Sequence, residues 1–108
     1  MLSPFTQEDQ MSTQEQTLER VEITYPSQYD VIFFNDDETP MVFVIQLLIE
    51  VFGHSMDQAK DITMMVHEEG RGVAGTYSRE LATQKVSEVT RICQHHGYPL
   101  KVKAEKNG

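Results

Sequence analysis

Residues 35–38 form a short acidic segment that interrupts the most apolar part of the chain and limits how that part can fold. The residues before it, 29–34, are rich in aromatic and β-branched side chains, which favours a buried strand. The residues after it, 40–52, include only two polar side chains, which favours a helix buried on most sides. An amide and three acids are costly to bury between two such elements. We therefore expect them at an exposed corner between the strand and the helix, with Thr39 as N-cap.

The rest of the chain predicts two further helices and two further strands. Ser55 and Gln58 have the spacing of a capping box, in which two side chains satisfy free backbone N–H groups at the start of a helix. Gly70 and Gly97 are typical of helix ends. Near the C-terminus, lysines alternate with apolar residues as in a strand with one solvated face. The predicted elements are strand 29–34, helix 40–52, helix 55–69, strand 73–77, helix 79–95 and strand 100–105.

This order predicts a small α+β domain, β-α-α-β-α-β, with a three-stranded antiparallel sheet packed on three helices. A chain of 108 residues allows one such domain with a modest core, in which we expect Met64, Met65 and Cys93. Residues 29–108 would form the domain. Residues 1–28 would form a disordered N-terminal extension, because they carry five acids, one arginine and few apolar side chains. That extension is either an inert tail or an arm that a partner engages.

Charge and composition argue against several classes of protein. The formal net charge is −8, from 17 acidic and 9 basic residues, whereas nucleic-acid-binding surfaces are basic. No apolar run reaches the roughly 18 residues of a membrane span, and the N-terminus lacks the pattern of a signal peptide. One cysteine allows neither an internal disulfide nor a thiolate cluster for zinc. We expect a cytoplasmic monomer without a cofactor.

The exposed corner and the second helix together suggest a site for a cationic group beside an apolar pocket. Asn35 and Asp37 carry acceptor oxygens, and a neutral His67 adds a nitrogen lone pair if it faces them. An ammonium group has three donors and needs about three acceptors. Since His67 accepts only while uncharged, binding should weaken as the pH falls. The neighbouring pocket would be lined by Met41, Val44, Thr63 and Val66.

Three other interpretations fit the same residues. In the first, Asp36 and Asp37 only cap the following helix, and His67 is a buried core histidine. In the second, His67 and an aspartate hold a metal in a small hydrolase, although the chain contains neither His-Glu-x-x-His nor Gly-x-Ser-x-Gly. In the third, a structural or interaction domain of the same fold has no pocket. We expect a binding protein rather than an enzyme.

Residues 31–41, Val-Ile-Phe-Phe-Asn-Asp-Asp-Glu-Thr-Pro-Met, strongly resemble the ClpS adaptor family. The resemblance covers about residues 28–106. It implies a cytosolic bacterial adaptor of the N-degron pathway, which captures proteins that begin with Leu, Phe, Tyr or Trp. The adaptor would deliver them to the ClpAP protease through the N-terminal domain of the ClpA unfoldase. A regulator of the unfoldase that captures no substrate is the alternative. Further matches are Val66-His67, the glycine-rich turn, Glu80 with Thr83-x-Lys85-Val86, and His96-x-x-Pro99-Leu100.

Carried over by position, the resemblance implies a role for each part of the site. Asn35, Asp37 and His67 would hold the free α-amino group of a substrate, and Asp36 would add negative potential. Glu80 and Lys85 match the surface that meets the unfoldase, although their helix positions alone indicate an ordinary solvated face. The N-terminal extension matches the arm used in delivery. The side-chain pocket would be lined by Thr39, Met41, Val44, Leu47, Thr63, Val66 and Leu100.

Thr63 departs from the family pattern, because well-known members carry a methionine at this position. Threonine is smaller and branched, so the pocket should be roomier and should fit flat aromatic rings better than leucine. Losing contact with one or two methylene groups would weaken Leu binding by about 1–2 kcal/mol. Equal affinity for peptides that begin with Leu and with Phe would contradict this hypothesis. Such a change is typical of a paralogue with altered specificity.

Overall fold

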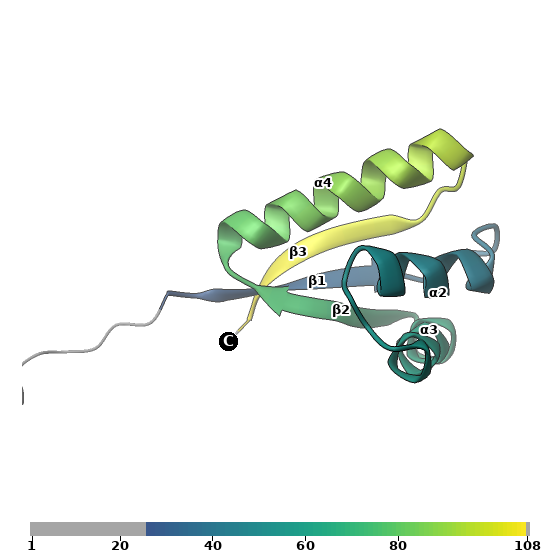
Figure 1. Cartoon of the computed structure of the whole chain (residues 1–108), viewed down its shortest axis with the longest axis horizontal. Helices are drawn as coiled ribbons and strands as arrows, with labels where there is room; N and C mark the ends of the chain where they lie inside the picture. Colours follow the sequence, from purple (N-terminus) through teal and green to yellow (C-terminus); the bar gives the residue numbers. More distant parts are fainter. Residues whose placement is uncertain (1–25, 108) are drawn as a thin grey trace, which may run out of the picture.

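The structure is a computed structural model and describes residues 26–107. The predicted N-terminal extension lies outside these residues up to position 25. Figure 1 shows the order of the elements, which confirms the predicted α+β fold. The elements are β1 (Gln28–Phe34), α2 (Met41–Glu50), α3 (Met56–Glu69), β2 (Arg71–Tyr77), α4 (Arg79–His96) and β3 (Lys101–Asn107).

The three strands form an antiparallel sheet in the order β2-β1-β3, so β1 is the central strand. At its C-terminal end, Phe34 pairs with Arg71 on one side and Lys101 on the other. The register with β2 shifts between Val31 and Ile32, which leaves Ala74 as an extra residue in β2. The acidic corner therefore leaves the sheet from its middle strand, between two neighbouring strands.

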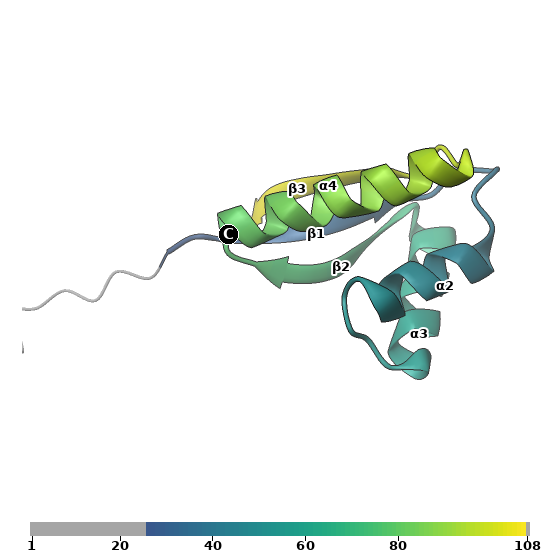
Figure 2. The same cartoon turned by 45° about the horizontal axis from the view of Figure 1, so that its top comes forward.

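The helices pack against the sheet in two groups. Helix α4 contacts all three strands, whereas α3 packs against α2 and β2 (Figures 1 and 2). Val31 and Phe33 of β1 are fully buried in the core, because alternate side chains of a strand point to the same face. The predicted burial of Cys93 in α4 is confirmed. Burial raises the pKa of the Cys93 thiol, and the negative charge of Asp36 raises it further.

Helix α2 is shorter and less buried than predicted. It begins at Met41 with Pro40 in the N-cap position, so the prediction of Thr39 as N-cap is wrong by one residue. It ends at Glu50, and Gly53 then adopts a left-handed conformation with φ of 75°. Only one stripe of α2 faces the core, and Val42 on the other side is 66% exposed. The buried residues of the helix are Phe43, Val44, Leu47 and Leu48.

The predicted capping box of α3 is confirmed. The backbone N–H of Gln58 donates to Ser55 Oγ over 3.1 Å, and the backbone N–H of Ser55 donates to Gln58 Oε1 over 3.4 Å. The prediction of Met64 and Met65 as core residues is wrong, since they are 43% and 54% exposed. They lie off the buried stripe of α3, which consists of Ala59, Thr63 and Val66.

Strand β2 begins two residues earlier than predicted and includes Gly72, which packs directly against α3. A Cβ atom at this position would lie 2.8 Å from Cγ2 of Val66, so any larger residue would force Val66 or the strand to shift. The prediction that glycines here allow a close approach is therefore confirmed at Gly72. Among the helices within residues 26–107, none is both long enough and apolar enough to cross a membrane.

Candidate functional site

One backbone hydrogen bond joins the acidic corner to the end of α3. The N–H of Asn35 donates to the carbonyl oxygen of Gly70 over 2.9 Å. Gly70 ends the helix in a left-handed conformation with φ of 90°, and Arg71 then pairs with Phe34 across the sheet. His67 lies in the last turn of α3, directly before this contact. Two segments separated by about thirty residues are thereby placed side by side.

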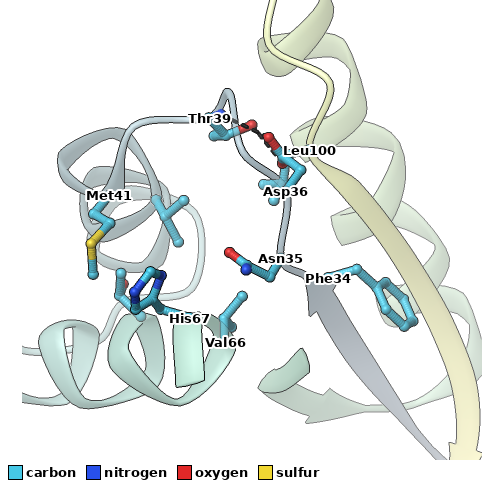
Figure 3. Close-up of a pocket in the computed structure, with 10 residues that line it drawn as sticks. Phe34, Asn35, Asp36, Thr39, Met41, Val66, His67 and Leu100 are labelled. Carbon is cyan, nitrogen blue, oxygen red and sulfur yellow. Dashed lines mark hydrogen bonds between the residues drawn. The ribbon is translucent and has the colours of Figure 1, made fainter. Parts of the chain in front are cut away.

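Asp36 shapes the corner itself. Its Oδ1 atom accepts hydrogen bonds from the backbone N–H groups of Glu38 and Thr39, each over 2.7 Å. Its Oδ2 atom accepts a hydrogen bond from the Thr39 hydroxyl over 2.8 Å. In Figure 3 the Asp36 carboxylate points toward Thr39 and not toward Asn35. The capping interpretation was thus partly right for Asp36, although this residue caps the turn before the helix and not the helix itself.

These hydrogen bonds also set the acidity of Asp36. Burial alone would raise the pKa of its carboxyl group, because burial disfavours the charged form. The hydrogen bonds from the Thr39 backbone, the Thr39 hydroxyl and the Glu38 backbone outweigh that effect, and the pKa lies below its ordinary value. Asp36 is therefore a charged, internally bonded part of the corner.

A small cavity, partly open to solvent, lies between the corner, α2 and α3, and about 270 Å³ of empty space, open solvent included, surrounds it. Figure 3 shows the side chains of Asn35 and His67 pointing into the same space from two different elements. His67 is exposed, so the interpretation of this residue as a core histidine is wrong. The residues that line the cavity are Phe34, Asn35, Asp36, Thr39, Met41, Val44, Thr63, Val66, His67 and Leu100.

The structure brings together most, but not all, of the residues that the sequence assigned to this site. Leu47 is buried in the core and does not line the cavity. Asp37 is exposed and is also not among the lining residues. Phe34 was not predicted, and its ring points away from the cavity in Figure 3, beneath the guanidinium of Arg71 at 5.2 Å. Its position as the last residue of the predicted strand, next to the corner, could have indicated that Phe34 borders the cavity.

The surroundings of Asn35 and His67 are negatively charged. Three carboxylates follow Asn35 directly in the sequence, and Glu68 and Glu69 follow His67. Arg71, four residues after His67, forms an ion pair with Glu105 over 2.9 Å, and Lys101, which pairs with Phe34, is outnumbered by these carboxylates. Such a field attracts a cationic group. Within residues 26–107, no three His, Cys, Asp or Glu side chains are grouped so that they could hold a metal ion.

Lys85 and Glu80, which the family resemblance assigned to a partner surface, lie away from the cavity on α4. Glu80 is exposed in the first turn of the helix. The ammonium group of Lys85 donates to the carbonyl oxygen of Val51 over 2.6 Å and lies 5.8 Å from the ring centres of Phe52 and Tyr77. The interpretation of Lys85 as an ordinary solvated residue is therefore wrong, because this side chain ties α4 to the end of α2.

Comparisons with known proteins agree with this architecture. Residues 24–103 match the family described as ATP-dependent Clp protease adaptor protein ClpS. The chain is 45% identical over 82 residues to the ATP-dependent Clp protease adapter protein ClpS of Desulforapulum autotrophicum, covering 76% of this chain and 79% of that protein. It is 46% identical over 90 residues to the protein of the same name from Deinococcus radiodurans, covering 83% and 80%.

A solved structure shows the same fold. The structure of Agrobacterium tumefaciens ClpS2 bound to L-phenylalaninamide superposes with a TM-score of 0.74 at 34% sequence identity, covering 77% of this chain and all of that chain. The sequence match over most of the chain and the shared fold lead to the same assignment. The chain belongs to the ClpS family of Clp protease adaptor proteins.

Proposed function

We propose that the cavity binds the first residue of a substrate polypeptide. The α-amino group would lie at Asn35 and His67, and the first side chain would pack against Met41 and Val44. The observation that carries this proposal is that two exposed polar side chains and an apolar wall share one small cavity.

The polar side of the cavity has the chemistry that an ammonium group requires. The carbonyl oxygen of Asn35 and the free lone pair of a neutral His67 accept two of its three hydrogen bonds. The Asp37 carboxylate, next along the exposed corner, adds charge and would accept the third. An acetylated N-terminus offers one neutral N–H and no charge, so it would lose most of this interaction.

The ligand of a related protein supports the apolar part of the proposal. L-phenylalaninamide, bound by the Agrobacterium tumefaciens protein, carries a free α-amino group and a benzyl side chain. The same chemistry fits a cavity with polar atoms at one side and apolar atoms at the other. We therefore propose that the preferred first residues are Phe, Tyr, Trp and Leu, the bulky apolar side chains of N-degron substrates.

We further propose that this protein delivers its substrates to the N-terminal domain of the ClpA unfoldase. The relatives are named adapters of the ATP-dependent Clp protease. Exposed Glu80 lies near the end of the sheet where β1 begins, whereas the cavity lies where β1 ends (Figure 1). Seven residues of β1 separate these ends by about 20 Å at ~3.3 Å per residue. A substrate and the unfoldase would therefore fit on the adaptor together.

The first experiment measures fluorescence anisotropy with a labelled peptide that begins with Phe, beside the same peptide acetylated at its N-terminus. Binding of the free peptide and loss of binding on acetylation would support the proposal. Failure of both peptides would contradict substrate capture and favour a regulator of the unfoldase. A Glu80→Lys variant that still binds peptide but no longer binds the unfoldase domain would support the delivery surface. Lys101→Glu, an exposed charge reversal on β3, is its control.

A further inference from the structure

Thr63 is the one polar residue among the buried positions of α3, and its hydroxyl is unpaired. The side chain is 3% exposed, and Oγ1 has no hydrogen-bond partner within residues 26–107. A threonine inside a helix usually donates to the carbonyl oxygen four residues earlier. Thr83 of α4 does so, with Oγ1 donating to Arg79 O over 2.9 Å. Thr63 thus differs from Thr83 in leaving its donor unused.

The side chains around Thr63 offer its hydroxyl no other hydrogen-bond partner. Thr63 lines the cavity, and the four side chains that share the apolar wall with it contain no nitrogen or oxygen. Burying a hydroxyl without a partner costs free energy, because the group has given up its hydrogen bonds to water. A bound ligand that supplies a partner would recover this cost. The other wall residues are Met41, Val44, Val66 and Leu100.

We infer that Thr63 is a specificity-determining residue whose hydroxyl pairs with a polar atom on the bound side chain. This inference rests on the proposed capture of an N-terminal residue. Tyrosine carries a phenolic O–H that donates and accepts, and tryptophan carries an indole N–H that donates. Phenylalanine and leucine carry neither, so they leave the hydroxyl of Thr63 unpaired. The site therefore prefers an N-terminal Tyr or Trp over an N-terminal Phe.

The size of this preference follows from a single neutral hydrogen bond. Such a bond corresponds to an affinity difference of about 2- to 10-fold between Tyr and Phe. The opposing possibility is rotation of the Thr63 hydroxyl toward the carbonyl oxygen of Ala59, four residues earlier. That rotation would make the wall wholly apolar, and Phe would then bind at least as tightly as Tyr because it has no hydroxyl to desolvate.

Three peptides that differ only in their first residue test the inference by fluorescence anisotropy. The first residues are Tyr, Phe and 4-methylphenylalanine, which matches the length of Tyr without its hydroxyl. The native protein should bind the Tyr peptide about 2- to 10-fold more tightly than either other peptide. Thr63→Val keeps the branched shape and removes the hydroxyl, so this variant should lose the preference. Thr83→Val removes a hydroxyl that is already paired and should keep it.

The outcomes separate this inference from the proposed function. If the Phe peptide binds through its free amine but Tyr has no advantage over 4-methylphenylalanine, the specificity role of Thr63 is wrong and substrate capture stands. The specificity role of Thr63 is also wrong if the Thr63→Val variant keeps the Tyr preference while a thermal unfolding transition shows that it is folded. If none of the three free-amine peptides binds, substrate capture is wrong and the inference falls with it.

Discussion

Two junctions of this molecule use polar side chains in opposite ways. At the junction of α2 and α3, the polar groups form hydrogen bonds with other groups of the protein. Lys85 donates to Val51 O, and Ser55 and Gln58 cap each other. At the acidic corner, Asp36 is also hydrogen-bonded within the protein. The exposed polar side chains of Asn35 and His67 instead line a cavity. The first arrangement stabilises the fold. The second keeps hydrogen-bonding capacity for a ligand, and the predictions below separate the two.

The largest expected effect is the loss of peptide binding when both polar side chains of the cavity are removed. A hydrogen bond to a charged group is worth about 1.5–3 kcal/mol, so Asn35→Ala with His67→Ala should weaken binding of a Phe peptide by at least about 100-fold. Because both residues are exposed, the free energy of unfolding should change by less than about 1 kcal/mol. Anisotropy and urea unfolding measure the two quantities. His95→Ala, an exposed histidine on α4, is the matched control.

Lys85→Met should show the opposite behaviour. Methionine keeps most of the apolar stem but removes the ammonium group, which leaves the carbonyl of Val51 without this donor. We expect the free energy of unfolding to fall by about 1.5–3 kcal/mol in urea titrations, while the affinity for the Phe peptide stays unchanged. Lys103→Met on β3 is the control, since Lys103 is exposed. If Lys85→Met keeps its stability but loses peptide binding, Lys85 serves the binding site and not the fold.

Asp36→Asn should lower stability by about 1 kcal/mol at neutral pH, because an amide is a weaker acceptor than a carboxylate. The folded-state pKa of Asp36 lies below its unfolded value of about 3.9, so the charged form stabilises the fold above that pH. This contribution is lost as the pH falls through the folded pKa. The stability difference between native and variant proteins should therefore shrink below about pH 4. Asp61→Asn, an exposed position on α3, is the matched control.

Thr63→Val should have a similarly small effect of the opposite sign, a gain in stability. Removing a buried, unpaired hydroxyl should raise the free energy of unfolding by about 1 kcal/mol, which corresponds to about 4–8 °C in Tm for a domain of this size. Thr83→Val should not raise it, because its hydroxyl is paired. A loss of stability in Thr63→Val would show that the hydroxyl has a partner in solution.

Local sequence patterns predicted the elements, the start of α3 and the ends of α3 and α4 well, since these depend on neighbours three or four residues apart, whereas the N-cap of α2 was misplaced by one residue. The capping box at Ser55 and the acidic corner are examples. Contacts between distant segments escaped prediction. The bond from Lys85 to Val51 joins residues 34 positions apart, and nothing in either segment indicates it. Met64 and Met65 were misplaced because hydrophobicity alone does not tell which side of a helix faces the core.

In the site, too, local features were easier to predict than contacts between distant segments. The approach of His67 to Asn35 was expected if both lay on one side of the domain, and the Asn35–Gly70 backbone bond holds them there. The turn that Asp36 forms with Thr39 was anticipated only in part, as a helix cap, although the two residues have the spacing of a side-chain turn. Leu100 was expected to line the cavity only because of the family resemblance. It lies far from the corner in the sequence, so no pattern near it indicates the contact.

The central place of β1 has a consequence for how the protein is made. β1 leaves the ribosome before every other helix and strand of residues 26–107, but one of its two partners, Lys101–Asn107, follows all of them. Closing a loop of about seventy residues is slow relative to local helix formation. The cavity wall that needs Leu100 is therefore completed only after the other helices and strands that line the cavity have been synthesised. A nascent chain without its last strand would have neither a finished sheet nor a finished site, so folding and the capacity to bind arise together.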